Sequence, residues 1–493
     1  MPLGQLTDEI APQRVVKLPV GEVRALAYDS REVEPGTLFF AIPGVHVDGH
    51  DYVPQAVDRG ALAVVVEREL SGLAVPQLVV KRARDALADA ADAWYDHPSR
   101  KLHVIGITGT DGKTTTAFLA EAMLRAAGRR PGLMGTVEVG IGDQRSANEQ
   151  RNTTPEALEL QALLAAMVAA GNDSVVMEAT SHGLAQARTR NVVFDVGILT
   201  NLTSEHLEFH GSWENYRAAK GMLFQQVPMS ILNADDPSVA YFHAVADGRV
   251  VTYGLDNEAD VRASEVEARA NGTAFTVTTE NWTGRVDLQL PGSFNVHNAL
   301  AVMALARVED IDLDLASRAL GAVVGVPGRM ETVDLGQPFG VVVDYAHTAD
   351  SLGKVLRVLR PLASGRVIAV FGSAGERDPT KRPAMGRASA ELADVTIVTD
   401  EDPRLEDPRL INEAIAQGAR DAGARDGETL FVIDERPAAI SHAIGLAQAG
   451  DVIVLAGKGH EQTIIYGTEG RWWDEKEVAR RALRDAGYGG ADG

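Results

Sequence analysis

The chain has 493 residues, contains no cysteine and carries a formal net charge of −22. Its length predicts several domains rather than one, and the lack of cysteine excludes disulfides, thiolate metal sites and thiol nucleophiles. The acidity disfavours nucleic acid as a partner because polyanions repel one another, and the lack of both an apolar run of roughly 20 residues and a signal-peptide pattern predicts a cytoplasmic protein without membrane insertion.

The first 98 residues alternate short apolar runs with turn signals. Residues 38–42 and 61–66 are two such runs, and Pro-Gly and Asp-Gly dipeptides lie between runs of this kind. Short apolar runs bounded by turn residues are typical of strands. We therefore predict a small mixed α/β domain over residues 1–98, with a linker near residues 97–101.

Residues 99–328 repeat a pattern of strand, loop and helix. Short apolar runs that close on a polar turn are typical of buried parallel strands. Residues 252–290 alternate more strictly between apolar and polar side chains, which predicts an antiparallel extension. The predicted parallel strands are residues 102–107, 174–178, 196–199 and 229–232.

A new alternation fills residues 329–493. Its regular βαβ spacing implies right-handed crossovers in a doubly wound, Rossmann-like sheet, and ligands of such sheets lie beyond the carboxyl ends of the strands. The fold class predicted for the whole chain is therefore α/β with three domains. The strands predicted here are residues 340–344, 367–371, 395–399, 430–433 and 451–455.

The most informative segment is residues 107–116, Ile-Thr-Gly-Thr-Asp-Gly-Lys-Thr-Thr-Thr. It lies between an apolar run and an amphipathic run, which is the strand–loop–helix order of a phosphate-binding loop. Lys113 adds a mobile positive charge, and the Thr114 hydroxyl can reach Mg²⁺. The general P-loop has a glycine where this chain has Ile107, and the alternative is a glycine-rich turn without a ligand. The residues predicted to bind nucleotide phosphates are Gly109, Thr110, Asp111, Gly112, Lys113, Thr114 and Thr115.

Polar side chains follow the next two predicted strands of this domain. Glu178 ends one strand, where a carboxylate can hold Mg²⁺; its alternative role is to cap a helix. His206 and His210 follow the other strand. A single histidine in a loop is more often structural, but two near a nucleotide site make a metal role for one of them an equal alternative. Lys220 lies in a predicted helix over residues 213–224, and from its spacing alone it is an ordinary solvated lysine.

Residues 152–155, Asn-Thr-Thr-Pro, precede a predicted helix. Their amide and two hydroxyls suit a phosphate or a sugar. A helix N-cap followed by proline explains the same pattern, and the sequence alone favours this second interpretation.

Polar loops follow the predicted strands of the last domain. Residues 344–348, 372–378 and 456–461 would meet at one sheet edge and form a polar crevice, to which Lys381 and Arg382 add positive charge. One such loop would be weak support for a site, but three at one edge favour it.

A fourth loop, residues 401–408, combines carboxylates with Arg404. Such a loop suits a zwitterion or a diamine, because carboxylates bind an ammonium and a guanidinium binds a carboxylate. The alternative is a salt-bridged turn.

These motifs resemble, in order, those of the Mur ligase family, the ATP-dependent amide-forming enzymes of peptidoglycan precursor synthesis. The resemblance spans nearly the whole chain and is greatest to the branch that adds the third peptide residue, the UDP-N-acetylmuramoyl-tripeptide synthetases. The matching motifs are Asp29-Ser-Arg31, Gly109-Thr-Asp-Gly-Lys-Thr-Thr115, Asn152-Thr-Thr-Pro155, Ser181-His-Gly-Leu184, His206-Leu-Glu-Phe-His-Gly211, Asn233-Ala-Asp-Asp-Pro237, Phe294-Asn-Val-His-Asn298, Pro327-Gly-Arg-Met-Glu331, Asp344-Tyr-Ala-His-Thr348 and Gly457-Lys-Gly-His-Glu461.

The resemblance implies three domains, for a UDP-sugar, for ATP and for the incoming amino acid, in a protein that we expect to be a monomer. It implies that the uridine diphosphate is held by Ser30, Val45, His46 and Val47. The muramoyl-dipeptide would be contacted by Asn152, Thr153, Thr154, Thr180, Gln186 and Arg188. The incoming diamino acid would be contacted by Arg377, Glu401, Asp402, Pro403, Arg404, Gly457 and Glu461.

The resemblance also implies two cofactors, ATP and Mg²⁺. Beyond the phosphate loop, ATP would be contacted by His297, Asn298, Arg329 and Asp344. Catalysis would fall to Lys113, Glu178, His206 and Lys220, and Mg²⁺ would be held by Thr114, Glu178, His206 and Lys220. Lys220 matches a lysine that the family carbamylates, which reverses its interpretation as a solvated side chain.

The implied reaction has two steps. The substrate carboxylate attacks the γ-phosphate of ATP to give an acyl phosphate, and the amine of the amino acid then forms the amide through a tetrahedral intermediate. Lys113 and two metal ions would position the phosphates and neutralise their charge. Domain closure would bring the amine to the acyl phosphate and exclude water.

The loop at residues 401–404 departs from one pattern of the family. Members that add meso-diaminopimelate usually carry Asp-Asn-Pro-Arg where this chain has Glu-Asp-Pro-Arg. Arg404 is kept and suits a distal carboxylate, but Asp402 puts an anion in place of an amide, which should favour a side chain that ends in a bare ammonium. We therefore predict lysine or ornithine, with meso-diaminopimelate close behind. Asp111 replaces the usual Asn, and Thr180 replaces a common Ser but keeps the hydroxyl.

Two alternatives stay open from the sequence. One is a folylpolyglutamate synthetase-like ligase, which a separate N-terminal domain with Asp29-Ser-Arg31 argues against. The other is a nucleotide-binding protein without catalysis, which intact Lys113, Glu178, His206 and Lys220 argue against.

Overall fold

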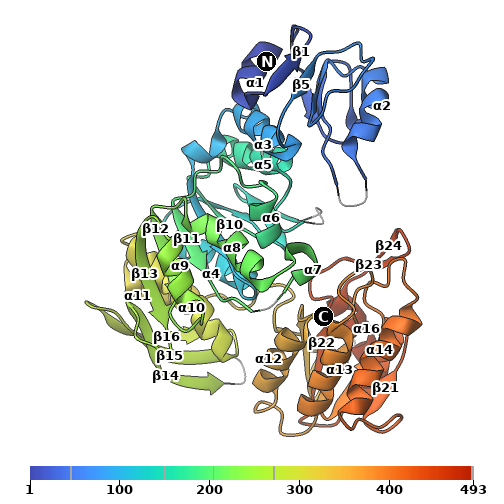
Figure 1. The fold of residues 1–493 in the computed structure, drawn as a ribbon. Helices are drawn as coiled ribbons and strands as arrows, with labels where there is room; N and C mark the ends of the chain where they lie inside the picture. Colours follow the sequence, from blue (N-terminus) through green and yellow to red (C-terminus); the bar gives the residue numbers. More distant parts are fainter. Residues whose placement is uncertain (45–46, 149–151, 204, 270–271, 490–493) are drawn as a thin grey trace. The chain divides into compact units, whose positions relative to one another are not determined.

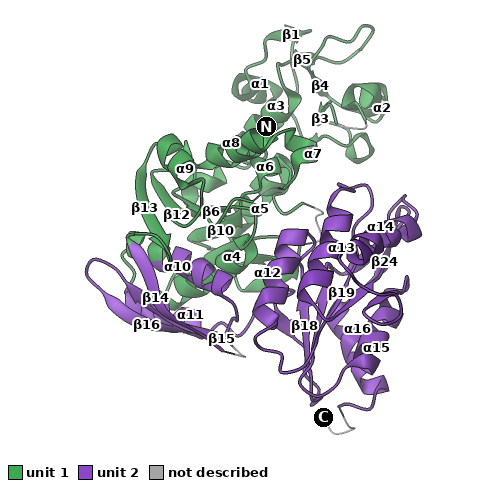
Figure 2. Cartoon of the chain, turned by 60° about the horizontal axis from the view of Figure 1, so that its bottom comes forward, with its two compact units in different colours: residues 1–260, 304–311 green, residues 261–303, 312–493 purple. Residues whose placement is uncertain are grey.

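The computed structural model describes residues 1–44, 47–148, 152–203, 205–269 and 272–489, in two compact units (Figure 2). Unit 1 contains residues 1–260 and 304–311, and unit 2 contains residues 261–303 and 312–493. Both units combine helices with sheets whose strands are mostly parallel, so the predicted α/β class is confirmed (Figure 1). In the described part of the chain, no helix has the length and apolar character that a bilayer span requires.

The N-terminal part of unit 1 is a five-stranded sheet. Its strand order is β1-β5-β4-β3-β2, and only β1 is antiparallel to its neighbour. Alternate residues of the strands face the two sides, so Phe40 packs in one apolar cluster and Phe39 in the other. The elements are α1 (Leu3–Ile10), β1 (Arg14–Val16), β2 (Ala25–Ala27), η1 (Ser30–Glu32), β3 (Thr37–Phe40), η2 (Gly49–Tyr52), α2 (Val53–Asp58), β4 (Ala63–Val66), β5 (Gln77–Val79), α3 (Ala83–Trp94) and η3 (Pro98–Lys101).

The central part of unit 1 is a larger sheet. Its elements are β6 (His103–Thr108), α4 (Lys113–Ala126), β7 (Pro131–Met134), β8 (Glu138–Ile141), β9 (Gln144–Ala147), α5 (Ala157–Ala169), β10 (Ser174–Glu178), α6 (Ser181–Ala185), β11 (Val196–Leu199), α7 (Leu207–His210), α8 (Trp213–Phe224), β12 (Met229–Asn233), α9 (Val239–Val245) and β13 (Arg249–Gly254). Their order is β13-β12-β11-β6-β10-β7-β8-β9, parallel from β13 to β7. Strands β7 to β9 form an antiparallel extension that the sequence patterns did not predict.

The register of the central sheet determines which residues meet at the candidate site. Glu178 at the end of β10 pairs with Ile107 of β6, and Leu199 at the end of β11 pairs with Thr108. Because β6 lies between β10 and β11, the residues that follow all three strands meet at one edge of the sheet.

Unit 2 begins with three strands and two helices. They are β14 (Val261–Arg269), β15 (Gly272–Thr278), β16 (Thr283–Leu288), α10 (Ser293–Val308) and α11 (Leu313–Gly321), and the last residues of α10 belong to unit 1. The three strands are antiparallel, as the alternation over residues 252–290 predicts.

The rest of unit 2 is a sheet covered by helices on both faces. Its elements are β17 (Glu331–Thr332), β18 (Gly340–Asp344), α12 (Ala349–Leu359), β19 (Val367–Phe371), α13 (Lys381–Leu392), β20 (Val395–Val398), α14 (Pro408–Asp421), β21 (Leu430–Val432), α15 (Arg436–Leu446), β22 (Val452–Ala456), β23 (Thr463–Tyr466), β24 (Glu469–Trp472) and α16 (Glu475–Asp485). The order is β17-β18-β22-β19-β20-β21, and all but β17 are parallel. Helices α12 to α14 pack on one face, and α15 and α16 pack on the other, which confirms the doubly wound arrangement.

Candidate active site

The candidate phosphate loop joins β6 to α4. Gly109 has a φ of +147°, and a Cβ at this position would lie 1.9 Å from Oγ1 of Thr200, so only glycine fits. Gly112 has a φ of +83° and is the N-cap of α4. The predicted strand–loop–helix order is confirmed, and the N-terminus of α4 has the geometry by which helices hold anions.

Two residues of the segment after β11, Thr200 and Asn201, form hydrogen bonds with this loop. Asn201 accepts a hydrogen bond from the N–H of Thr110 on its backbone oxygen (2.8 Å) and one from the N–H of Asp111 on Oδ1 (3.0 Å). Oγ1 of Thr200 donates to the backbone oxygen of Asp111 at 2.6 Å. The loop is therefore fixed through the backbone of Asp111, and these bonds do not depend on the side chain that stands there.

Two lysines converge on one backbone oxygen of the loop. Nζ of Lys113 donates to the oxygens of Gly109 (2.9 Å) and Thr110 (2.6 Å), and Nζ of Lys220 donates to the oxygen of Gly109 at 2.7 Å. Burial, together with the charge of Lys113, lowers the pKa of Lys220 well below its usual 10.5. Burial thus shifts Lys220 towards its neutral amine form beside the phosphate loop.

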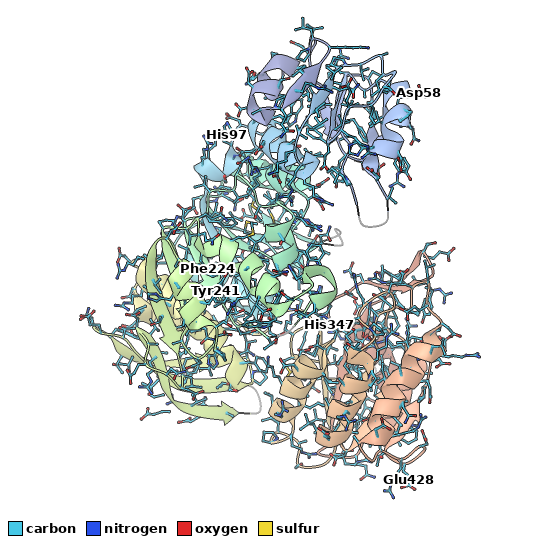
Figure 3. All side chains as sticks on the ribbon, viewed as in Figure 1. Asp58, His97, Phe224, Tyr241, His347 and Glu428 are labelled. Carbon is cyan, nitrogen blue, oxygen red and sulfur yellow. The ribbon has the colours of Figure 1, made fainter. Side chains whose placement is uncertain are left out.

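Lys220 is only 2% exposed, so its interpretation as a solvated lysine is wrong. The reason is the packing of α8, which the spacing of its residues does not reveal. Phe224, one turn further along α8 and labelled in Figure 3, packs against Phe242 with ring centroids 5.4 Å apart. The contact turns the face of α8 that bears Lys220 into the protein, where Nζ also lies 4.6 Å from the ring centre of Tyr216.

Glu178 is fully buried at the end of β10. Its Oε1 accepts from the N–H of Thr136 at 2.8 Å, and its Oε2 accepts from the Thr136 hydroxyl at 2.9 Å. It does not cap a helix, because Thr180 is the N-cap of α6 and accepts from the N–H of Gly183. A carboxylate has about four lone-pair positions, so these two bonds leave Glu178 able to ligate a cation.

Residues 152–155 do not cap α5. That helix begins at Ala157 with Glu156 as its N-cap, and no side chain caps it. The Thr154 hydroxyl instead donates to the backbone oxygen of Glu178 at 2.9 Å and lies 3.0 Å from the hydroxyl of Thr180. The N-cap interpretation is therefore wrong, and the threonines face the end of β10.

Further polar residues extend this group. The hydroxyl of Thr153 lies 3.0 Å from that of Thr136. Arg188 donates to the backbone oxygen of Thr154 (2.9 Å) and to Oε1 of Gln186 (2.7 Å), and it forms an ion pair with Glu156 at 2.9 Å. Asn152 is exposed.

Three histidines lie together after β10 and β11. The ring centroid of His182 is 4.7 Å from that of His206 and 5.4 Å from that of His210. Burial and the other two histidines lower the pKa of His182 to about 3, so it is neutral at physiological pH. His206, with a φ of +56°, precedes α7. Within the described residues no three His, Asp or Glu side chains are gathered as a metal-ligand group.

Two of the four residues expected to hold the uridine diphosphate, Ser30 and Val47, are described in the N-terminal sheet region. Ser30 is buried in η1, and its hydroxyl donates to Oε1 of Gln55 at 2.9 Å. Val47 is 53% exposed. Val45 and His46 lie outside the described residues.

Four residues expected to contact ATP belong to unit 2. Asp344 at the end of β18 accepts from the N–H groups of Met330 and Ala346, both at 2.8 Å. The guanidinium of Arg329 lies 4.5 Å from the ring centre of Tyr345. On α10, Asn298 is buried and donates to Oδ1 of Asn295 at 3.0 Å, and His297 lies one residue before it.

A buried lysine pairs with two carboxylates at the end of the last sheet. Nζ of Lys458 donates to Oδ1 of Asp402 at 3.0 Å and to Oε2 of Glu461 at 2.5 Å. Burial alone would lower the pKa of Lys458, but the two carboxylates outweigh it and raise the pKa. Asp402 also accepts from the N–H of Ile465 at 2.9 Å. Asp402, the anion on which the prediction of lysine or ornithine depends, is therefore already paired with a cation of the protein itself.

Glu401 differs from Asp402. It is 6% exposed, and its Oε2 is buried without a hydrogen-bond partner among the described residues. A Cβ at Gly457 would lie 2.5 Å from this oxygen, and burial raises the pKa of Glu401.

Arg404 holds the other side of this loop. It has a φ of +54°, and its backbone N–H donates to the oxygen of Ile465 at 3.0 Å. Pro403 is buried, whereas Arg377 is exposed. Nζ of Lys381, the first residue of α13, donates to the backbone oxygen of His347 (labelled in Figure 3) at 3.0 Å.

Several residues of this region were missed by sequence reasoning. Thr136 follows β7, a strand too short to show a pattern, and nothing in the sequence signals its bonds to Glu178. Tyr216, whose hydroxyl lies 2.9 Å from that of Thr110, stands one turn before Lys220 on α8, and that spacing was a usable signal. Lys458 belongs to the motif Gly457-Lys-Gly-His-Glu461, but the sequence alone assigned no function to this lysine.

Comparison with known proteins gives three domain matches along the chain. Residues 22–95 match the Mur ligase family catalytic domain, residues 107–306 the Mur ligase middle domain, and residues 328–459 the Mur ligase glutamate ligase domain.

Known proteins are similar to the chain over nearly its full length. A UDP-N-acetylmuramyl-tripeptide synthetase of Roseiflexus sp. (strain RS-1) is 48% identical over 95% of this chain and 96% of its own. A UDP-N-acetylmuramoyl-L-alanyl-D-glutamate--2,6-diaminopimelate ligase of Geobacillus thermodenitrificans (strain NG80-2) is 44% identical over 94% and 95%. A solved structure of an enzyme with that second name has 30% identity, a TM-score of 0.66, and 99% coverage of both chains.

Proposed function

The chain belongs to the Mur ligase family of ATP-dependent ligases and has its three-domain α/β fold, and we propose that it adds a diamino acid to UDP-N-acetylmuramoyl-L-alanyl-D-glutamate as the third peptide residue. The names of the relatives at 44–48% identity support this substrate. The observation that carries the proposal is the meeting of the phosphate loop, Glu178 and buried Lys220 at adjacent strand ends.

In the first proposed step, the substrate carboxylate attacks the γ-phosphorus of ATP, the bond to the β-phosphate oxygen breaks, and ADP leaves. The loop amides and Lys113 hold the phosphates in line, and positioning of this kind is the main protein contribution to phosphoryl transfer. When the nucleotide binds, Nζ of Lys113 gives up its hydrogen bonds to the backbone oxygens of Gly109 and Thr110 and binds the phosphates instead. The product is an acyl phosphate.

Thr114, Glu178, His206 and Lys220 are the residues that we expect to hold Mg²⁺. Magnesium takes few protein ligands and keeps water and phosphate oxygens, so one carboxylate with free lone pairs fits it. Lys220 suits carbamylation because CO₂ reacts with a neutral amine, and burial favours that form. When bound, the ion supplies charge neutralisation for the phosphates.

In the second proposed step, the amine of the amino acid attacks the acyl carbon and phosphate leaves from the tetrahedral intermediate. The hydroxyls of Thr153, Thr154 and Thr180, next to Glu178, are suited to orient the dipeptide carboxylate. Arg188 helps to fix the backbone of this segment, since it donates to the backbone oxygen of Thr154.

For the amino acid itself we propose lysine or ornithine. Glu401 rather than Asp402 supports this choice, because the buried Oε2 of Glu401 needs a hydrogen-bond donor and a terminal ammonium supplies one. Meso-diaminopimelate is the second candidate. It is favoured by the names of several relatives and by Arg404, whose Nε is buried without a hydrogen-bond partner among the described residues.

The test is amide formation by purified protein with ATP, Mg²⁺ and UDP-N-acetylmuramoyl-dipeptide, with each diamino acid in a separate reaction and the product identified by mass. We expect the highest kcat/KM with lysine or ornithine. A preference for meso-diaminopimelate would overturn this specificity but not the ligase function. Amide formation on folate-glutamate instead, or no amide at all, would overturn the function.

A further inference from the structure

We propose that Arg436 is a positioning residue of the amino-acid site, whose guanidinium fixes the spacing of the two loops at residues 401–404 and 457–461. This inference rests on the function proposed above and deepens it, because those loops are where we expect the diamino acid to bind. No motif in the sequence points to Arg436.

Arg436 joins the ends of two strands that are not neighbours in the sheet. It is the first residue of α15 and is fully buried. Its Nη2 donates to the backbone oxygen of Ala456 at 2.7 Å, and its Nη1 donates to that of Asp400 at 3.2 Å. Ala456 ends β22 and Asp400 follows β20, and β19 lies between these strands. Each acceptor is thus the residue directly before one of the two loops.

A second buried pair holds the guanidinium in place. Glu475, the first residue of α16, accepts from Nη2 of Arg436 at 2.7 Å and from its Nε at 3.0 Å on Oε2, and it is itself fully protected from solvent. The indole N–H of Trp473 donates to Oε2 of Glu475 at 2.6 Å. Burial alone would lower the pKa of Arg436, but Glu475 outweighs it and raises the pKa. The planar fork of arginine therefore has one fixed orientation.

Local stability does not account for this arrangement. A cation is unfavourable at the N-terminus of a helix, which is where Arg436 lies. Replacing a buried ion pair by apolar residues of similar volume is often neutral or stabilising. Helices α15 and α16, which lie side by side on one face of the sheet (Figure 2), already share an apolar cluster. What the arginine adds is a link between the backbones that lead into the two loops, beyond the side-chain bond between Lys458 and Asp402.

The loops themselves leave little room for a shift. A Cβ at Gly457 would lie 2.5 Å from Oε2 of Glu401, and Nζ of Lys458 reaches across to Asp402 at 3.0 Å. A displacement of about 1 Å can lower the rate of a bound reaction by about 10². Loss of this link should therefore affect the diamino acid, which these loops are proposed to hold, more than ATP or UDP-N-acetylmuramoyl-dipeptide.

The experiment measures the KM of Arg436→Lys for each of the three substrates. An ammonium cannot bridge two carbonyls and hold a carboxylate in the same plane, so we expect the KM for the diamino acid used by the wild type to rise about tenfold or more. The KM values for ATP and for UDP-N-acetylmuramoyl-dipeptide should stay within about twofold.

Arg366→Lys is the matched control. Arg366 pairs with buried Asp451 at 2.8 Å and donates to the backbone oxygen of Leu446 at 2.6 Å, but it precedes β19, at the amino ends of the same strands. We expect this control to lose thermal stability without a change in the KM for the diamino acid. If Arg436→Lys does not fold, Trp473→Phe decides. It removes the donor to Glu475 together with part of a buried ring, but leaves Arg436 and both loops unchanged, and it should raise the same KM by about two- to fivefold.

An unchanged KM for the diamino acid in folded Arg436→Lys, or an equal rise in all three KM values, would overturn the proposal. So would the same rise in the Arg366→Lys control. A wild-type enzyme that forms no amide with any diamino acid would overturn the proposed function and this inference with it, and that result differs from a loss seen only in the variants.

Discussion

At the scale of single residues, surroundings decide the chemistry of lysine in this protein. Lys101 is an exposed lysine paired with Asp96, whereas Lys220 is buried on α8 and donates to the oxygen of Gly109. Removing the amine from water disfavours its charged form. The same side chain is thus a solvated cation in one place and, in another, a buried amine whose charged form is disfavoured.

Lys220→Met should make the protein inactive but more stable. In bicarbonate-free buffer at pH 7 the wild type keeps a buried amine whose protonation burial opposes, and methionine of similar volume removes that cost. We expect a rise in Tm of about 2 °C or more, since about 1 kcal/mol shifts Tm by 2–4 °C in domains of 150–250 residues. The measurement is calorimetry with an activity assay.

The pH dependence of this gain has a definite sign. The folded-state pKa of Lys220 lies below the usual 10.5, so between the two values the unfolded chain binds a proton that the folded chain does not. Wild-type stability therefore rises with pH across this window. The difference in Tm between variant and wild type should shrink as the pH approaches 10.5; a constant difference would contradict a neutral Lys220.

Lys113→Met should abolish ligation while the fold persists. Lys113 is the cation that we expect on the ATP phosphates, and the loss of one such contact lowers kcat by about 10²–10³. Phosphate release coupled to amide formation is the measurement. Lys101→Met, just before the other end of β6, is the control and should retain activity; less than a tenfold loss in Lys113→Met would contradict the role.

At the scale of elements, strand ends build the site. β6, β10 and β11 end in register, so the phosphate loop, Glu178 and Thr200 meet at one edge. The turn between β7 and β8 joins them through Thr136, whose N–H and hydroxyl both bind Glu178. A short extension of the sheet thus orients the carboxylate proposed to hold Mg²⁺.

Thr136→Val should raise the Mg²⁺ concentration needed for half-maximal activity by about tenfold, because outer-shell partners of metal ligands typically contribute 10–100-fold to affinity. Valine keeps the shape and the backbone N–H but removes the hydroxyl bonds to Glu178 and Thr153. Activity is measured in a Mg²⁺ titration. Thr7→Val, which loses a single bond to Leu3 in α1, is the control; equal shifts in both variants would refute the role of Thr136.

At the scale of the whole molecule, the charge of −22 coexists with a proposed site for anionic substrates. The two are compatible because Lys113 and the N-terminus of α4 act locally, whereas the net charge acts at long range and is screened by salt. The boundaries that we predict at residues 98 and 328 stay predictions. The matched segment at residues 22–95 lies within the predicted domain 1–98, and the one at residues 107–306 lies within the predicted domain 99–328.

We expect the protein to be a monomer in solution. Copies that each carry a charge of −22 repel one another. Sedimentation equilibrium should give the mass of one chain at both low and physiological salt. A mass that doubles as the concentration increases would contradict this.

The sequence by itself determined the α/β class, the strand–loop–helix order around Lys113 and strands such as residues 174–178 and 340–344, because these features depend on local periodicity and on glycine. The tertiary structure alone decided which face of α8 is buried, hence the surroundings of Lys220, and that Lys458 pairs with Asp402. It also decided that Thr136 binds Glu178 and that Arg436 joins two loops. These contacts link residues far apart in the chain, and no local pattern encodes the strand register and helix packing that bring them together.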